Sequence, residues 1–251
     1  MRLNRFLKTM GPLAALVAMG ALAGCDKVHF NVGEEGVPLA ELDLGGTPPD
    51  SVALLGPDTV IVSEGADFTI TVDGEGPVAE RMRFKLDGGT LGILREGDNW
   101  SEEGGIATVR VTMPPPNSLS LAGSGTMVVA AVSDTPQANI AGSGTLELPN
   151  VAAGTMTVNI AGSGTLNAAG TADRLNLNVM GSGSAAMAGL KVESASVNIA
   201  GSGDATFSSD GSVDANIVGS GDVTVRGSAR CKVNSVGSGS LVCERETEST
   251  D

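Results

Sequence analysis

The chain has 251 residues and a formal net charge of −14, with 36 glycines, one tryptophan and no tyrosine. Such an acidic chain lacks the clustered Lys and Arg residues that binding to nucleic acid, or adsorption to anionic lipid by charge alone, requires. Because aromatic residues are scarce, the core must consist of Val, Ile, Leu, Ala and Met, which suits thin stacked layers.

Residues 1–24 are predicted to be a lipoprotein signal peptide. Basic residues precede an apolar run over 11–23, which is too short to span a bilayer as a helix. The run ends in Leu-Ala-Gly-Cys, which resembles the lipobox of bacterial lipoproteins, and in that class the cysteine, here Cys25, carries the lipid, palmitate included. An ordinary secretory peptide is the alternative. We expect a lipoprotein anchored in a membrane of the bacterial cell envelope, facing the periplasm or the cell surface.

A tether and a β-rich segment follow the leader. Residues 25–50 are rich in Gly and Pro and are predicted to be a flexible tether, in which His29 is a solvated side chain. Over 51–116, runs that alternate apolar with polar residues are separated by turn clusters, which indicates strands. We expect this segment to cap a solenoid. Its Trp100 either packs against the cap or stacks on carbohydrate.

The tripeptide Gly-Ser-Gly occurs seven times in the second half of the chain, and successive copies start 18 to 20 residues apart. Such a period is typical of a solenoid. Columns of like residues, two positions apart, line up beside the triplet, as expected for strands. Three places before the triplet, six copies carry an asparagine, at Asn139, Asn159, Asn178, Asn198, Asn216 and Asn234.

Each coil is therefore expected to contain a strand, a Gly-Ser-Gly corner and a second strand. Glycine allows positive φ and close approach of neighbouring coils, and stacked Asn side chains can exchange amide hydrogen bonds. A meander or propeller of antiparallel hairpins is the alternative, but the matched columns favour an in-register stack. We predict an all-β fold, a parallel β-helix of about seven short coils over 117–244, followed by a disordered acidic tail over 245–251.

Two pairs of residues are candidate sites. Cys231 and Cys243 occupy columns that are apolar in earlier coils, so an exported protein is expected to join them in a disulfide. Asp204 and Asp222 lie at the same position of consecutive coils. We interpret them as solvated surface, with a cation site or a glycosidase carboxylate pair as weaker alternatives. No His or Lys is placed to activate the triplet serines, and we expect no catalytic residue, metal or cofactor.

The stretch from Ser51 to Glu244 resembles the bacterial head GIN domain family, labelled an autotransporter adhesin. The matching features are the β-rich lead-in, the Met-Pro step at 113–114, and Gly-Ser-Gly-Asp at 201–204 and 219–222. The resemblance implies a lipid-anchored or secreted parallel β-helix. We expect a non-enzymatic, adhesin-like binding module that contacts the membrane through its lipid and binds a glycan or a protein. A polysaccharide-active enzyme and a purely structural envelope protein are the alternatives.

Overall fold

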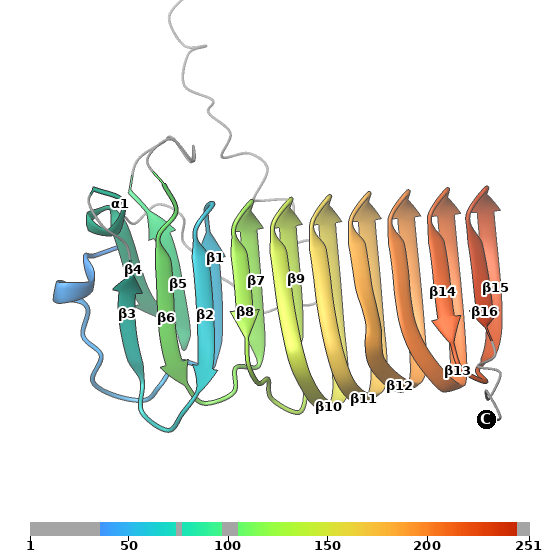
Figure 1. Ribbon diagram of the computed structural model, residues 1–251, viewed down its shortest axis with the longest axis horizontal. Helices are drawn as coiled ribbons and strands as arrows, with labels where there is room; N and C mark the ends of the chain where they lie inside the picture. Colours follow the sequence, from blue (N-terminus) through green and yellow to red (C-terminus); the bar gives the residue numbers. More distant parts are fainter. Residues whose placement is uncertain (1–35, 74–76, 97–104, 245–251) are drawn as a thin grey trace, which may run out of the picture. The chain divides into compact units, whose positions relative to one another are not determined.

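The fold is a β-solenoid, a stack of flattened coils whose strands pair in parallel along one axis (Figure 1). The computed structural model describes residues 36–73, 77–96 and 105–244, all within one compact unit that begins at Gly36. Helical residues in this part are confined to one short 3-10 turn, η3 (Leu39–Glu41), and one helical turn, α1 (Pro77–Glu80). The predicted all-β parallel helix of about seven coils is confirmed.

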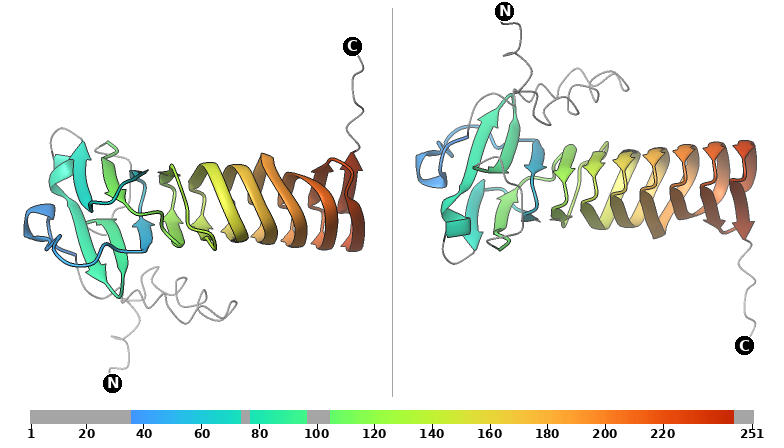
Figure 2. Two further views of the ribbon diagram at one scale, coloured as in Figure 1. Left: turned by 90° about the horizontal axis from the view of Figure 1, so that it is seen from below. Right: turned by 90° about the horizontal axis from the view of Figure 1, so that it is seen from above.

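The Gly-Ser-Gly coils form an uninterrupted parallel ladder. Their strands are β7 (Ser118–Gly123), β8 (Thr126–Val129), β9 (Gln137–Gly142), β10 (Thr145–Gly162), β11 (Thr165–Gly181), β12 (Ser184–Gly201), β13 (Asp204–Gly219), β14 (Asp222–Arg226), β15 (Arg230–Gly237) and β16 (Ser240–Glu244). Strands β10 to β13 run from one corner to the next, so each wraps from one face of the solenoid to the other (Figure 2). Irregular register in the middle of these strands marks the bend.

The Gly-Ser-Gly corners are required because successive coils meet there backbone to backbone. At Gly201 φ is +131°, and a Cβ would lie only 2.2 Å from the carbonyl oxygen of Gly181 in the preceding coil. The third glycine is equally confined, since a Cβ on Gly203 would lie 2.5 Å from Cγ1 of Val179. Between them, the Ser202 N–H donates to the Gly181 carbonyl at 2.8 Å. The triplet is therefore a structural corner, as its repetition predicts.

The core consists of inward-pointing apolar columns, one layer per coil. The column that follows the asparagines is buried in every coil from β7 to β13, with at most 2% exposure at Leu121, Ile140, Ile160, Val179, Ile199 and Ile217. Aliphatic residues and Met fill nearly the whole stack of repeats, and Phe207 is its one buried aromatic among the described residues. Layers of this kind need no large side chains, which explains the scarcity of aromatics.

The β-rich segment before the repeats contributes two further parallel layers. Strands β1 (Ser51–Leu55) and β2 (Thr59–Glu64) pair in parallel with β7 and β8, so that Gly56-Pro57-Asp58 occupies the corner. Strands β5 (Thr90–Arg95) and β6 (Thr108–Met113) pair with the opposite edges of β1 and β2. The layer formed by β1 and β2 therefore lies between two layers that follow it in the chain.

Antiparallel strands close this end of the stack (Figure 1). Strand β3 (Thr69–Asp73) pairs with β6, and strand β4 (Met82–Asp87) pairs with β5, both antiparallel. An isolated bridge between Val37 and Phe84 covers the outer edge of β4. The segment that sequence analysis assigned as a whole to a cap thus combines two solenoid layers with two capping strands.

A buried ion pair holds these layers together. Asp58 is 0% exposed and Arg95 is 4% exposed. Both carboxylate oxygens of Asp58 accept hydrogen bonds from the Arg95 guanidinium, and the Ala107 N–H donates to Oδ1 at 2.9 Å. Arg95 also donates to the Gly105 carbonyl at 3.1 Å. The corner of one layer is thereby joined to the end of β5 and the start of β6, and its charges are fully compensated.

Candidate binding surface

Outward-pointing residues of the strand segments that precede the corners form a flat surface, here called the ladder face. It comprises the outer sides of β7, β9 and β15 and of the second halves of β10 to β13. Because these segments pair in register, each outward position forms a straight column along the stack. Two adjacent columns distinguish the face: one of asparagines and one of apolar residues.

The asparagine column is a continuous hydrogen-bonded ladder. In each step, Nδ2 of one Asn donates to Oδ1 of the Asn in the preceding coil, at 2.9–3.0 Å, from Asn234 back to Asn139. The stacking of amides is therefore confirmed, and the side chains point outward rather than into the corner. Each amide has two N–H groups and two acceptor lone pairs, so the ladder leaves outward-facing capacity in every coil.

The apolar column lies directly beside the asparagines, one residue before each triplet. Its members are Ala122, Ala141, Ala161, Met180, Ala200, Val218 and Val236. Met180 is 51% exposed, Val218 57% and Val236 71%. An outward position of a strand is ordinarily polar, so an apolar residue in every coil marks a surface suited to contact. This column was not among the predicted features, although the alternation of each strand assigns it to the outside.

No charged residue interrupts either of these two columns in the described chain. Charges on the ladder face lie in the columns further from the corner, at Arg174, Asp214, Arg230 and Lys232. The central strip thus combines repeated amide groups with exposed aliphatic side chains, at a spacing of about 4.8 Å per coil. Such a strip can contact an uncharged partner over several coils at once.

Asp204 and Asp222 lie on the other face and act on the backbone of the next coil. The Asp222 N–H donates to Oδ1 of Asp204 at 3.0 Å, and Ser240 donates to Oδ1 of Asp222 through both its N–H and its hydroxyl. One coil earlier, the equivalent N–H of Asp204 donates to the carbonyl of Gly183 instead. Among the residues that the structure describes, no group of three or more His, Cys, Asp or Glu side chains is arranged to hold a metal ion.

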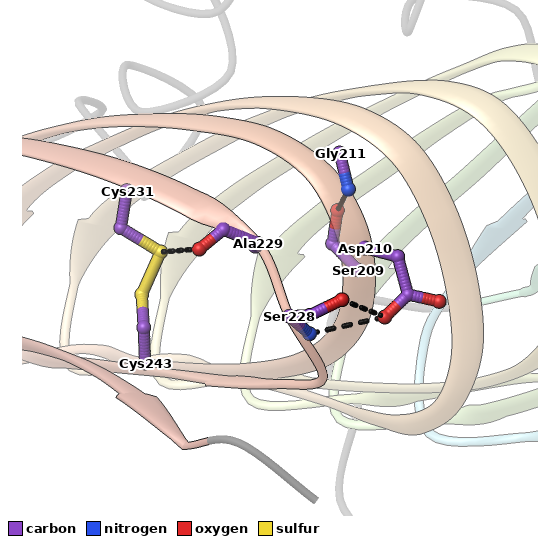
Figure 3. The surroundings of a disulfide bond; sticks show 7 residues. All are labelled: Ser209, Asp210, Gly211, Ser228, Ala229, Cys231 and Cys243. Atoms are coloured by element: carbon purple, nitrogen blue, oxygen red, sulfur yellow. Dashed lines mark hydrogen bonds between the residues drawn. A yellow bond between two sulfur atoms is a disulfide. The ribbon is translucent and has the colours of Figure 1, made fainter.

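Cys231 and Cys243 form a disulfide across the last coil, which agrees with the expectation from their columns (Figure 3). Their Cα atoms are 6.7 Å apart, one on β15 and the other on β16. Ser235, which takes the place of the buried Ile217 of the preceding coil, donates its hydroxyl to the Gly239 carbonyl at 2.8 Å. A covalent bond and a hydrogen bond therefore support a layer whose core is small.

An ionic cluster at the turns opposite the corners was not foreseen. Asp210 contacts Nζ of Lys191 at 2.7 Å. It also accepts two hydrogen bonds, at 3.0 Å each, from the N–H and hydroxyl of Ser228 (Figure 3). The hydrogen bond from Lys191, followed by those from Ser228, lowers the pKa of Asp210 to about 2. The three residues come from turns of unequal length in successive coils, so no repeated spacing relates them.

Three predicted residues lie outside the described ranges: the lipidation candidate Cys25, His29 and Trp100. The roles assigned to these three residues from the sequence therefore stay predictions. Within the ranges that are described, no helix has the length and apolar character needed to cross a membrane.

The chain belongs to the family described as putative auto-transporter adhesin, head GIN domain, whose profile matches residues 48–229. The match begins just before β1 and ends between β14 and β15, so it includes the parallel layers that carry no Gly-Ser-Gly triplet. The resemblance inferred from the repeats is thereby confirmed. No curated protein matches the chain.

Several solved structures share the fold. A putative adhesin from Bacteroides fragilis has a TM-score of 0.67 at 17% identity and covers 78% of this chain and 93% of its own. A putative lipid binding protein from Parabacteroides distasonis has a TM-score of 0.62 at 22% identity, covering 79% and 94%. A putative adhesin from Parabacteroides merdae has a TM-score of 0.60 at 15% identity, covering 79% and 92%. At these identities the likeness shows the fold alone.

Proposed function

We propose that the protein is a non-enzymatic, adhesin-like binding module of the bacterial cell envelope that contacts its partner through the ladder face. The observation that carries the proposal is the apolar column, in which Met180, Val218 and Val236 are exposed at outward positions that a strand ordinarily fills with polar residues. Membership of an adhesin-named family supports the same class of function and an envelope or extracellular location.

The partner that fits this surface is uncharged and extended. The strip offers amide donors and acceptors beside Met and Val side chains, and it carries no charge to hold an acidic polymer. Repetition allows many weak contacts of the same kind to act together, so affinity grows with the number of coils that a partner spans. We favour a protein surface or a neutral glycan over an acidic polysaccharide.

Catalysis by the aspartate pair is disfavoured by what these carboxylates contact. Asp204 and Asp222 accept hydrogen bonds from the next coil, and both are exposed at the first position of a strand. A glycosidase needs two carboxyl groups on opposite sides of a bound sugar. Two members of one column lie on the same side.

Membrane attachment through Cys25 is the second part of the proposal. It rests on the Leu-Ala-Gly-Cys sequence after a basic and apolar leader. Mass spectrometry of the protein purified from cells is expected to find acyl chains on Cys25, and Cys25→Ser is expected to release the protein into the soluble fraction. An unmodified Cys25 in a membrane-free protein would contradict the anchor and leave the binding surface untouched.

Binding itself is tested with a pair of variants that flank one corner. Met180 lies on the ladder face and Ala186 lies on the other face of the solenoid, and both are exposed. The protein and its variants are applied to an array of neutral and acidic glycans and to intact cells. We expect Met180→Glu to weaken retention at least tenfold, because it places a charge in the apolar column, and Ala186→Glu to leave it unchanged. Equal effects of the two variants, or turnover of a polysaccharide, would contradict the proposal.

A further inference from the structure

The C-terminal end of the solenoid differs from its other end. At that other end, the antiparallel strands β3 and β4 cover the parallel layers. At the C-terminal end, β15 pairs with β13 and β16 pairs with β14, and no other strand of the described chain pairs with either of them. One edge of each strand therefore presents backbone N–H and C=O groups that are ready to pair with another strand.

Exposed apolar side chains are concentrated on the same coil, residues 230–244. Seven large apolar residues are exposed in the described part of the chain, and three of them belong to this coil: Val233 at 44%, Val236 at 71% and Val242 at 46%. Val233 points inward, and no further layer of the described chain covers it. The disulfide between Cys231 and Cys243 holds β15 and β16 in place, so the edge is rigid before any partner arrives.

The charge of the last coil also differs from that of the whole chain. Residues 230–244 carry two basic side chains, Arg230 and Lys232, and one acidic side chain, Glu244, whereas the chain carries a net charge of −14. Two copies of an acidic protein repel each other over most of their surfaces. The coil of residues 230–244 therefore adds no net acidic charge to a contact between two copies, and the acidic groups at this end of the sequence lie in residues 245–251, which follow the coil.

We propose that the last coil is a self-association surface at which a second copy of the chain binds tail to tail. A two-fold axis perpendicular to the strands makes β15 antiparallel to its counterpart in the second copy, and likewise β16. Placing Val233 opposite Val233, and the outward-pointing Val242 opposite Val242, makes the inward positions of each strand meet inward positions of its counterpart. Because Cys231 and Cys243 face each other across the coil, both valines lie near one line, and a single axis serves both strands.

The side chains are compatible with this register. Lys232 falls opposite Asn234 of the second copy, and Arg230 falls opposite Val236, so no cation meets a cation. Asn234 ends the asparagine ladder: it donates to Asn216, and no donor to its own Oδ1 lies among the residues described. Lys232 of the second copy supplies a donor for that oxygen. Two solenoids then continue as one stack, in which the asparagine column of each copy meets Lys232 of the other.

Sedimentation and crosslinking test the proposal, and the control variants change a residue in the preceding coil. Val242 lies opposite itself at the axis, whereas Thr224, its register partner in the preceding coil, lies outside the contact. We expect the full chain in mild detergent to form dimers whose dissociation constant rises about tenfold or more in Val242→Lys, because like charges then meet at the axis and apolar contact is lost. Thr224→Lys is expected to leave the dimer unchanged.

A disulfide crosslink between the two copies tests the proposed antiparallel register. Cα atoms of directly opposed antiparallel residues are about 4.5–5.5 Å apart, within the range of a disulfide. Val242→Cys is expected to form a covalent dimer on mild oxidation, and Thr224→Cys is not. A monomer at all concentrations overturns the proposal, as does a dimer that Val242→Lys leaves intact. Dimerisation only after deletion of residues 245–251 would also overturn it, because the chain's own tail would then cover the end.

Discussion

The corner glycines carry a specific energetic prediction, which Gly201→Ala tests. Two costs add in this variant. The backbone at φ +131° is a conformation that an L residue rarely adopts, and holding alanine there costs about 1–3 kcal/mol. In addition, the new Cβ would lie 2.2 Å from the Gly181 carbonyl oxygen, so the two coils must separate locally by about 1 Å.

The separation acts on the hydrogen bonds of the corner. The Ser202 N–H donates to Gly181 at 2.8 Å, and the Ser220 N–H donates to Gly201 at 2.9 Å. Each contributes about 1 kcal/mol net, so their distortion together with the backbone cost lowers the free energy of unfolding by about 3–5 kcal/mol. Since each coil contacts only its neighbours, we expect β13 to β16 to unfold before the coils that precede them.

Gly46→Ala is the matched control. Its φ is +103°, but nothing lies within 4 Å of a Cβ built there, so only the backbone cost of about 1–3 kcal/mol remains. Urea unfolding measures both losses, and hydrogen exchange locates the coils that open first. If the two variants lose equal stability, close approach between coils is not what selects glycine at the corners.

Three further predictions concern stability and titration. Asp58→Ala leaves the buried Arg95 without its counterion and is expected to lower the free energy of unfolding by about 3–5 kcal/mol, measured by urea unfolding; a loss below that of an exposed ion pair would refute it. Cys243→Ser is expected to cost about 3 kcal/mol through the lost loop constraint and to speed proteolysis of the last coil, whereas an unchanged digestion pattern would contradict this. The Asp210 carboxyl is expected to titrate at about 2 by NMR and to move toward 3.8 in Lys191→Met. Because the folded pKa lies below the unfolded value, its contribution to stability is present above pH 3.8 and is lost as the pH falls through 2; an unshifted carboxyl in Lys191→Met would show that Lys191 is not the main cause.

The solenoid layers outside the Gly-Ser-Gly repeats could not be predicted from the periodicity of the sequence. β1 and β2 form a coil in register with β7 and β8, yet Gly56-Pro57-Asp58 serves as their corner and shares only its first residue with the triplet. Their neighbours on the other side, β5 and β6, come later in the chain. A search for repeats compares consecutive segments, so it cannot detect a layer inserted out of order.

Some features of the candidate surface could likewise be predicted from the sequence, and others required the structure. The asparagine ladder was predictable because in-register stacking places like beside like, but its outward direction depends on how the corner closes. The apolar column is visible in the sequence only once the outward side of each strand is known. The Asp58–Arg95 pair spans 37 residues and belongs to no repeat, so only the folded chain brings it together.

By itself, the sequence determined the solenoid, its corners, its asparagine ladder and the pairing of Cys231 with Cys243. Each of these depends on contacts between adjacent coils, and such contacts leave identical residues at a constant period. The order of the first layers, the buried ion pair, the cluster at Asp210 and the open edge at β15 and β16 were decided only by the tertiary structure. These features depend on residues that are not repeated from coil to coil, so no period in the sequence reveals the contacts between them.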